Sequence, residues 1–267
     1  MIKQFTNLIV DLDGTLIGKD QKISPRVFDA INKLKNFIDI NIASGRESAG
    51  VIKYARQLKI NGPQISDNGA IIIDSLTKNN IWGNFISYDN SVDISKDIKK
   101  LDLPVLATHI SGTMRHLDFV PKEGFNRISI MDLYIDQANN IIDLLKNKYD
   151  IEICKVYLPY NDRWAVDLTN KGINKGHAAF ELSKILGIKL SNIIAVGDSY
   201  NDISVFKVSG MAIAMGDAPD ELKKIADYIA PSVDFDGLAV AIDEFILPKL
   251  RWKLLNYSIF WRDGRVV

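Results

Sequence analysis

Two aspartates, Asp11 and Asp13, follow the short apolar run 8–10, and Gly14 lets the chain turn away directly after them. Carboxylates held this close repel each other and favour a divalent cation with oxygen ligands, which points to Mg²⁺ and an anionic substrate. An aspartate can attack phosphorus to form an aspartyl-phosphate, and a second carboxylate can donate and then accept the proton. The pair therefore predicts a nucleophile at Asp11 and an acid/base at Asp13, although either aspartate alone could simply cap a turn.

A hydroxyl and adjacent backbone amides follow the second expected strand, residues 38–43. Ser44 and Gly45 stand there, followed by Arg46. Backbone N–H groups and a hydroxyl at such a place can hold a phosphate oxygen. The alternative is that Ser44 caps the next helix, with Glu47 completing a capping box, and the two roles are compatible. Arg46 is expected either to reach the substrate or to lie at the surface.

The second half of the chain holds a lysine at an expected helix start and two more carboxylates. Lys175 precedes Gly176, and a charge there would neutralise the nucleophile and bind a transferring phosphoryl group. Asp198 follows Gly197 at the end of an expected buried strand, residues 192–196, and Asp202 comes four residues later. Two further carboxylates would complete a magnesium site, with water in the remaining positions. The alternatives are a solvated lysine and simple N-capping by Asp198 or Ser199.

Apolar strands alternate with amphipathic helices at both ends of the chain, which predicts an α/β fold. We expect a Rossmann-like, mostly parallel sheet with helices on both faces. Ser24 and Pro25 predict the start of the first helix, because a capping side chain and a proline both favour that position. Asn68 and Gly69 predict the turn of a hairpin between residues 65 and 73. Because ligands of parallel sheets bind at the carboxyl ends of the strands, the polar groups should converge on one crevice.

The pattern changes between residues 78 and 165, where hairpins and two helices replace the regular alternation. We interpret this stretch as an inserted α+β cap domain and expect residues 1–77 and 166–267 to form the catalytic core. Three polar residues lie in or beside an expected hairpin of the insert: His109, Arg115 and His116. They would touch the non-phosphate part of a substrate if the insert closes over the crevice, and otherwise face solvent.

The overall composition limits the classes of partner. Lys+Arg and Asp+Glu both number 33 in the 267 residues, so we expect no broad attraction to nucleic acid or to an anionic membrane. Cys154 is the only cysteine, which excludes an intrachain disulfide and favours a reducing compartment. The N-terminal stretch lacks the pattern of a signal peptide, and no apolar run has the length of a membrane span. We therefore expect a cytoplasmic protein.

These motifs resemble those of the haloacid dehalogenase (HAD) superfamily, specifically the Cof-type phosphatases with a large α/β cap inserted between the second and third motifs. The matching strings are Asp11-Leu12-Asp13-Gly14-Thr15, Ser44, Lys175 and Gly197-Asp198 with Asn201-Asp202. The string Asn68-Gly69-Ala70 also matches an element that follows the second motif in this branch. The resemblance covers nearly the whole chain up to about Leu247.

The resemblance implies a role for each of these residues. Catalysis would belong to Asp11 as nucleophile and Asp13 as acid/base. Ser44, Gly45 and Lys175 would bind the phosphoryl group, and Asn201 would orient the loop or touch the phosphate. The ligands of Mg²⁺ would come from four residues: Asp11, the backbone carbonyl of Asp13, Asp198 and, in support, Asp202.

We therefore expect a magnesium-dependent phosphatase that hydrolyses a small phosphomonoester through an aspartyl-phosphate, with the insert acting as a lid. By resemblance, the substrate is a sugar phosphate or a related metabolite. A sugar phosphomutase is the near alternative, because such enzymes share this core and a related cap. A non-catalytic protein that binds a phosphorylated ligand is the distant one.

The segment 249–267 departs from the family pattern, because it combines aromatic and basic side chains. Its aromatic residues are Trp252, Tyr257, Phe260 and Trp261. Aromatic residues dominate buried interfaces, so we expect the segment either to pack on the core domain or to form a contact within a homo-oligomer.

Overall fold

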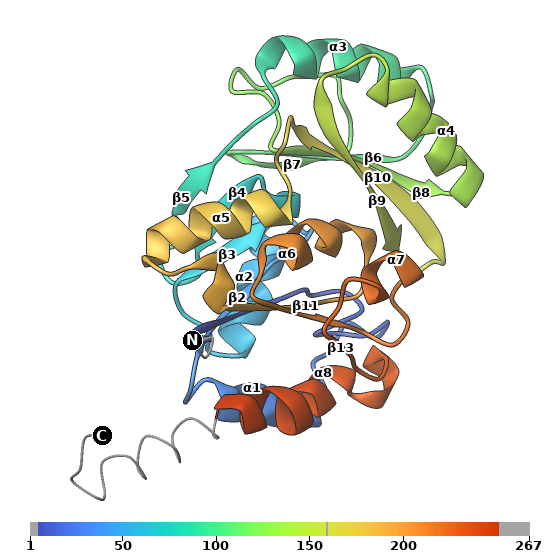
Figure 1. Cartoon of the computed structure of the whole chain (residues 1–267). Coiled ribbons are helices and arrows are strands. Elements are labelled where there is room, and N and C mark those ends of the chain that lie inside the picture. Colours follow the sequence, from blue (N-terminus) through green and yellow to red (C-terminus); the bar gives the residue numbers. More distant parts are fainter. Residues whose placement is uncertain (1–4, 159, 251–267) are drawn as a thin grey trace, which may run out of the picture.

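A parallel sheet forms the centre of the lower lobe in Figure 1. The structure is a computed structural model that describes residues 5–158 and 160–250, so most of the segment 249–267 lies outside the described residues. The sheet has five strands in the order β13-β12-β11-β1-β2, and every neighbouring pair is parallel. The strands are β1 (Asn7–Val10), β2 (Asp39–Ile42), β11 (Ile193–Gly197), β12 (Met211–Ala214) and β13 (Tyr228–Ile229).

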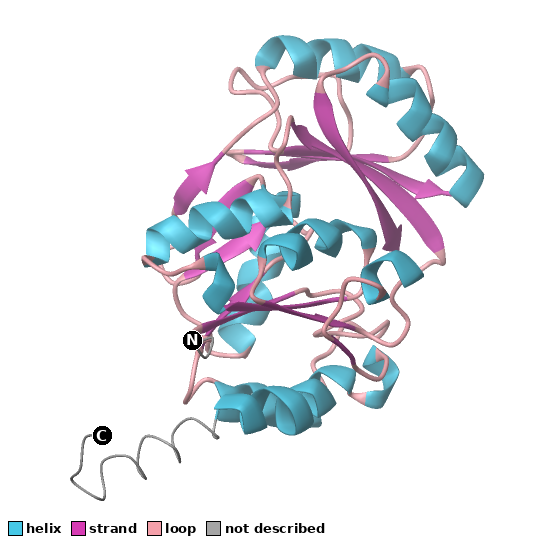
Figure 2. Ribbon diagram, viewed as in Figure 1, coloured by secondary structure: helices cyan, strands magenta, loops and turns pink. Residues whose placement is uncertain are grey.

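Helices cover both faces of this sheet, as expected (Figure 2). Leu8 and Val10 pack with α1, α2 and α8, whereas Ile9 packs with α5 and α6 on the opposite face. This division follows from the alternation of side chains along a strand. The helices are α1 (Pro25–Leu34), α2 (Ser48–Gln57), α5 (Lys175–Leu186), α6 (Ile203–Val208), α7 (Asp220–Lys223) and α8 (Gly237–Val240), the last continued by a π-helical stretch (Ala241–Ile246).

The start of α1 confirms the sequence prediction. Ser24 is the N-cap, its hydroxyl accepts a hydrogen bond from the backbone N–H of Val27 at 3.1 Å, and Pro25 occupies the first position of the helix. The expected hairpin is also confirmed, because β3 (Pro63–Ser66) and β4 (Ile71–Asp74) pair antiparallel. A third strand, β5 (Asn80–Gly83), extends this small sheet on the other side of β4.

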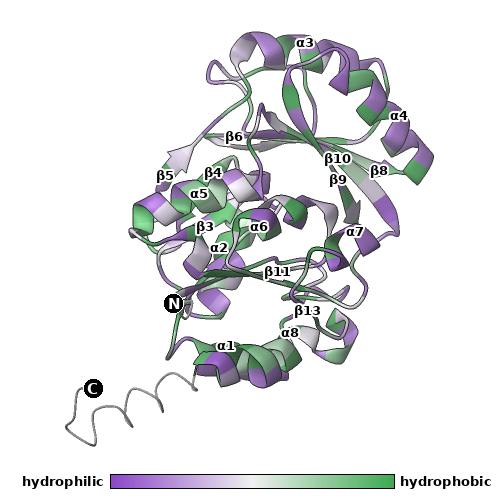
Figure 3. Ribbon diagram, in the orientation of Figure 1, coloured by the Kyte–Doolittle hydropathy of each residue, from purple (hydrophilic) through white to green (hydrophobic). Residues whose placement is uncertain are grey.

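The upper lobe contains a five-stranded antiparallel sheet in the order β7-β6-β8-β10-β9. One of its faces packs against α3 (Tyr88–Lys99) and α4 (Ile135–Lys146). Figure 3 shows α3 mostly in purple, whereas β11 in the lower lobe is green, as expected for an outer helix and a buried strand. The strands are β6 (Val105–His109), β7 (Gly112–Met114), β8 (Arg127–Leu133), β9 (Ile151–Leu158) and β10 (Arg163–Asn170).

The elements around the expected domain boundaries lead us to a revised proposal. The boundary at 165/166 falls inside β10, which stays in the cap sheet up to Asn170. The boundary at 77/78 precedes β5, which pairs with β4 on the side of the lower lobe. We propose that the cap spans about residues 86–171. Its two connections meet where the side-chain amide of Asn170 donates to the side-chain oxygen of Asn84 at 2.6 Å.

Candidate active site

The candidate site residues follow the carboxyl ends of three neighbouring parallel strands. Asp11 follows β1, Ser44 lies two residues after β2, and Asp198 follows β11. β1 lies between the other two strands, with Val10 opposite Ile42 on one side and Val196 on the other. The chain passes from β1 to β2 on one side, whereas the later strands β11, β12 and β13 lie on the other side of β1. Such a switch in strand order opens a crevice at the carboxyl edge of the sheet.

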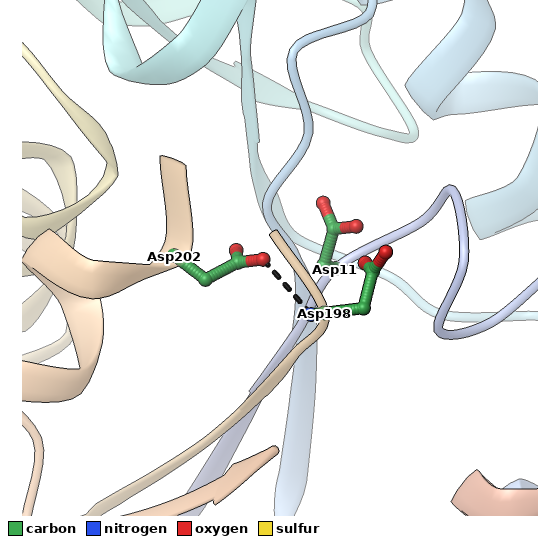
Figure 4. Close-up of side chains that lie close together, drawn as sticks. All are labelled: Asp11, Asp198 and Asp202. Atoms are coloured by element: carbon green, nitrogen blue, oxygen red, sulfur yellow. Dashed lines mark hydrogen bonds between the residues drawn. The ribbon is translucent and has the colours of Figure 1, made fainter. Parts of the chain in front are cut away.

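Three carboxylates converge in this crevice (Figure 4). Asp11, Asp198 and Asp202 each offer an oxygen, and these oxygens lie within 4.8 Å of one another. Asp202 lies on the short 3₁₀ helix η3 (Tyr200–Asp202). One oxygen of Asp202 accepts hydrogen bonds from the backbone N–H groups of Asp198 at 3.1 Å and Ser199 at 3.0 Å. These bonds close the loop after β11 and hold Asp198 beside Asp11.

Lys175 is the positive partner of this acidic group. Its Nζ lies 2.5 Å from Asp11 Oδ1 and 2.7 Å from Asp202 Oδ1, and its side chain is fully buried. Although burial lowers the pKa of Lys175, Asp11 and Asp202 raise it above its ordinary value, so the ammonium stays charged. Asn174 caps α5 by accepting from the N–H of His177 at 3.0 Å, which places Lys175 at the first position of the helix. The solvated-surface alternative for this lysine is therefore wrong.

The donor set around Asp11 and Asp198 fits a hard divalent cation. Burial is the main cause that raises the pKa of both carboxyls, and the neighbouring carboxylates raise both pKa values further. Lys175 lowers these pKa values but does not offset the increase, so its single positive charge does not compensate the negative charge of the group. Both oxygens of Asp202 are already bound to Lys175 and to backbone amides. Asp11 and Asp198 are therefore the side chains best placed to hold a divalent cation directly, and Asp202 positions them.

Gly14 allows Asp198 to approach the backbone beside Asp13. A Cβ built on Gly14 would lie 2.1 Å from Asp198 Oδ2, and the φ angle of Gly14 is +80°. A larger residue would push this carboxylate away, and it would also be strained in the left-handed conformation. The glycine thus lets the Asp198 carboxylate lie against the backbone directly after Asp13.

The side chain of Asp13 does not belong to the group of three carboxylates and is bound by Arg46. Arg46 donates from Nε to Asp13 Oδ2 at 2.8 Å and from Nη2 to Asp13 Oδ1 at 2.6 Å. The guanidinium also lies over the ring of Tyr54, 5.6 Å from its centroid. Arg46 therefore has a definite role in this structure, because it holds the expected acid/base by two charge-assisted bonds.

Ser44 and Gly45 lie at the edge of the same crevice, and Ser44 is buried. The Ser44 hydroxyl accepts from the backbone N–H of Arg46 at 3.1 Å, whereas the N-cap of α2 is Glu47, which makes no side-chain capping bond. The expected capping box is therefore wrong, because three loop residues separate Ser44 from the first turn of α2. The Ser44 hydroxyl remains on the crevice side of the loop.

Asn201 is held by Asn68, the asparagine of the Asn68-Gly69-Ala70 string. Its Nδ2 donates to Asn68 Oδ1 at 3.0 Å, and its Oδ1 is buried without a hydrogen-bond partner. Gly69, at φ +100°, is required there, since a Cβ would lie 2.3 Å from the carbonyl oxygen of Asn174. The string thus joins the hairpin turn to the helix that carries Lys175.

A buried ion network that the sequence analysis missed joins the cap to this crevice. Arg127 on β8 donates from Nη1 to both oxygens of Asp167 on β10, each at 3.0 Å, and its Nε lies 3.6 Å from Asp67 Oδ1 in the lower lobe. Asn68 Nδ2 donates to Asp167 Oδ2 at 2.8 Å. Burial raises the pKa of Asp67 to about 6, although Arg127 lowers it. Neither Arg127 nor Asp167 belongs to a motif. The sequence signal that could have revealed the network was Asp167, a charged residue inside the largely apolar strand β10, because a buried charge requires a partner.

A cavity of about 770 Å³ separates the two lobes above the carboxylates. Its lower wall includes Asp11, Asp13, Ser44, Gly45 and Asp198, and its upper wall is the face of the cap sheet opposite α3 and α4. The cavity has the size and the mixed lining of a small-molecule site. Among the described residues, no helix combines the length and apolar character of a bilayer span.

Comparisons with known proteins agree with this geometry. The 5-amino-6-(5-phospho-D-ribitylamino)uracil phosphatase YcsE of Bacillus subtilis is 28% identical over 244 residues, which cover 90% of this chain and 95% of that protein. A phosphoglycolate phosphatase of Methanothermobacter thermautotrophicus is 22% identical over 242 residues, covering 90% and 98%. The fold matches the solved structure of the HAD subclass IIB sugar phosphatase BT4131 with a TM-score of 0.75 and 21% identity, covering 90% and 98%. The model of the haloacid dehalogenase-like hydrolases matches residues 8–242, and the chain belongs to this family of enzymes.

Proposed function

We propose that this HAD-family phosphatase is magnesium-dependent and hydrolyses a small phosphomonoester through an aspartyl-phosphate on Asp11. The proposal rests above all on the place of Asp11, between the ammonium of Lys175 and the carboxylate of Asp198 on the floor of the cavity between the lobes. A bound Mg²⁺ would neutralise charge on the carboxylates and on the phosphoryl oxygens.

The chain's own residues account for both halves of the reaction. A carboxylate oxygen of Asp11 forms a bond to phosphorus while the ester P–O bond breaks, and Asp13 gives its proton to the departing alkoxide. Water then attacks the phosphoryl group, Asp13 takes the proton, and the Asp11 carboxylate is released. Lys175 holds Asp11 in line and binds the phosphoryl oxygens. Arg46 must release Asp13 when substrate enters, because a carboxylate held by two guanidinium bonds cannot deliver a proton.

The substrate class remains part of the proposal. The relatives named above act on a phosphoribitylamino-uracil and on phosphoglycolate, and the structural neighbour is named a sugar phosphatase. These names support a small phosphorylated metabolite as substrate. The single cysteine supports a reducing, cytoplasmic location.

A product assay on a panel of phosphomonoesters tests this function. The purified enzyme would be incubated with Mg²⁺ and each compound, and both free phosphate and isomerised sugar phosphate would be measured. Release of phosphate supports hydrolysis, whereas isomerisation without release would establish a mutase. Binding without either product would establish the non-catalytic alternative.

Asp198→Asn should weaken Mg²⁺ binding by at least about 10–100-fold, the range seen when even supporting residues of metal sites are changed. The reason is that Asp198 places a carboxylate oxygen within 4.8 Å of oxygens of Asp11 and Asp202. Calorimetric titration with Mg²⁺ measures this directly. Asp234→Asn is the matched control, because Asp234 also lines the cavity but does not belong to the three carboxylates. Equal affinity in the two variants would contradict the assignment.

Asp13→Asn should lower kcat by about 10²–10⁴, the usual contribution of one general acid/base. The amide keeps one acceptor for Arg46 but cannot exchange a proton with the leaving group. Steady-state kinetics with an alkyl phosphate measures the loss. A substrate with a much more acidic leaving alcohol should recover part of the rate, because it needs less protonation. A uniform loss for both substrates would argue that Asp13 only positions Arg46.

Arg127→Met should destabilise the protein by about 3–5 kcal/mol, because it leaves the buried charge of Asp167 without its positively charged partner. Urea unfolding measures this change. The double variant Arg127→Met with Asp167→Leu should recover much of the stability, since an apolar pair can replace a buried ion pair. The exposed Arg26→Met serves as control and should unfold like the wild type. A single variant as stable as the wild type would show that the network is not needed for cap packing.

A further inference from the structure

We propose that the alcohol part of the substrate is an aromatic ring, held against an apolar roof that the cap contributes. This proposal rests on the phosphatase function above and adds the class of substrate. The roof consists of five side chains that line the cavity from the cap sheet: Leu106, Met131, Val156, Leu158 and Ala165. They lie across the cavity from the carboxylates of the lower lobe.

The alternation of side chains along the cap strands produces this roof. On β8, Ile128 and Ile130 pack into the core beneath α3 and α4, whereas Ser129 and Met131 line the cavity. On β10, Val166 belongs to that core and Ala165 lines the cavity. An antiparallel sheet with one face toward water normally carries polar residues on that face. The apolar side chains on the cavity face would be explained if a bound ligand covers them.

The two buried charged residues on this face, Arg127 and Asp167, offer no free groups to a ligand, whereas the exposed Arg115, directly after β7, also lines the cavity. Arg127 and Asp167 bind each other and the loop at Asp67, as described above. Ser129 is buried and brings a hydroxyl to the lining. The hydroxyl groups of a sugar placed against the five apolar side chains would lose their hydrogen bonds to water and form few hydrogen bonds to the protein.

An aromatic ring suits the same surface. Its face would bury the partly exposed side chains of Leu106, Met131, Val156 and Leu158, and the thioether of Met131 can make favourable contacts with a ring. A row of rings flanks the roof, with the centroids of Tyr157 and Trp164 5.3 Å apart and those of Trp164 and Tyr200 6.2 Å apart. The edges of these rings could contact the face of an aromatic substrate.

Matched substrates test the proposal. We would compare three esters of primary alcohols with similar leaving groups: 2-phenylethyl phosphate, glucose 6-phosphate and ethyl phosphate. We expect kcat/KM for the aromatic ester to exceed that for glucose 6-phosphate by at least about 10-fold, the scale of discrimination by an apolar pocket. Ethyl phosphate presents little surface to the roof and reports the basal chemistry.

Variants of the roof separate this proposal from a general effect on the enzyme. Met131→Gln and Leu158→Asn should each lower kcat/KM for 2-phenylethyl phosphate by about 10-fold or more and leave ethyl phosphate unchanged. Leu144→Asn is the matched control, because Leu144 is 52% exposed on the outer helix α4. It should leave all three esters unchanged.

Binding of 3-phenylpropylphosphonate, in which CH₂ replaces the ester oxygen, tests the roof without hydrolysis. Calorimetry with Mg²⁺ should show binding by the wild type and the Leu144→Asn variant, and binding at least about 10-fold weaker by the two roof variants. Equal binding by all four proteins, or a preference for glucose 6-phosphate, would overturn the aromatic proposal. Phosphonate binding with no hydrolysis of any ester would instead overturn the phosphatase function and leave the roof in place.

Discussion

Asp11→Asn should reduce phosphate release to the rate of the reaction without enzyme. The amide has nearly the same shape as the carboxylate, but it is a poor nucleophile and cannot form the acyl-phosphate bond. Acid-quenched wild-type reactions should contain a phosphorylated peptide that includes residue 11, and the variant should not. Colorimetric phosphate release and mass spectrometry of the digested protein measure the two effects.

The fold of the Asp11→Asn variant should remain intact. Burial and the neighbouring Asp202 raise the pKa of Asp11, which means that its charge is unfavourable in the free protein despite Lys175. Removal of that charge should leave the melting temperature in metal-free buffer equal to or above that of the wild type.

Asp39→Asn is the matched control for this variant, because Asp39 is exposed at the start of the neighbouring strand β2. It should keep full activity. Wild-type turnover by Asp11→Asn with added Mg²⁺ would refute the covalent mechanism, and loss of the folded state would make the kinetic result a folding effect.

Lys175→Met should abolish activity and also destabilise the protein by about 3–5 kcal/mol, because two buried carboxylates lose their shared partner. Methionine keeps most of the length of the side chain, so the effect reports charge rather than an empty space. Urea unfolding in metal-free buffer measures the change in stability. Addition of Mg²⁺ should restore part of it, because an ion that binds only the folded state stabilises that state.

Lys171→Met provides the control from the same region of the chain. Its ammonium lies 2.8 Å from Asp150, but the two side chains are 70% and 74% exposed. An exposed pair contributes only about 0–1 kcal/mol, so this variant should unfold almost like the wild type and keep its activity. If the two lysine variants unfolded at the same urea concentration, the buried lysine would not be the partner that the carboxylates require.

The sequence predicted the elements of the core because their signals are local. Ser24 and Pro25 mark the start of α1 through capping geometry, and the Asn68-Gly69 turn marks the hairpin of β3 and β4. The apolar runs before Asp11 and Asp198 become neighbouring parallel strands. Each of these features depends on residues within a few positions, which is why a pattern in the chain can reveal them.

The partners of the polar side chains could not be predicted in the same way. Asp13 and Arg46 are 33 residues apart, and nothing local indicates that the expected acid/base is held by a guanidinium. The capping role expected for Ser44 failed because the loop after β2 continues for three more residues before α2 begins. The domain boundary at 165/166 fell inside β10 because strand pairing across the cap, rather than composition, decides where that strand ends.

The amino-acid sequence by itself determined the alternation of strands and helices, and with it the delivery of Asp11, Lys175 and Asp198 to strand ends and a helix start. Only the tertiary structure decided that Asp202 is occupied by Lys175 and backbone amides, that Arg127 joins the cap to the core, and that the roof of the cavity is apolar. The physical reason is that periodicity and capping act over a few residues, whereas burial, charge compensation and cavity lining depend on segments that meet only when the chain has folded.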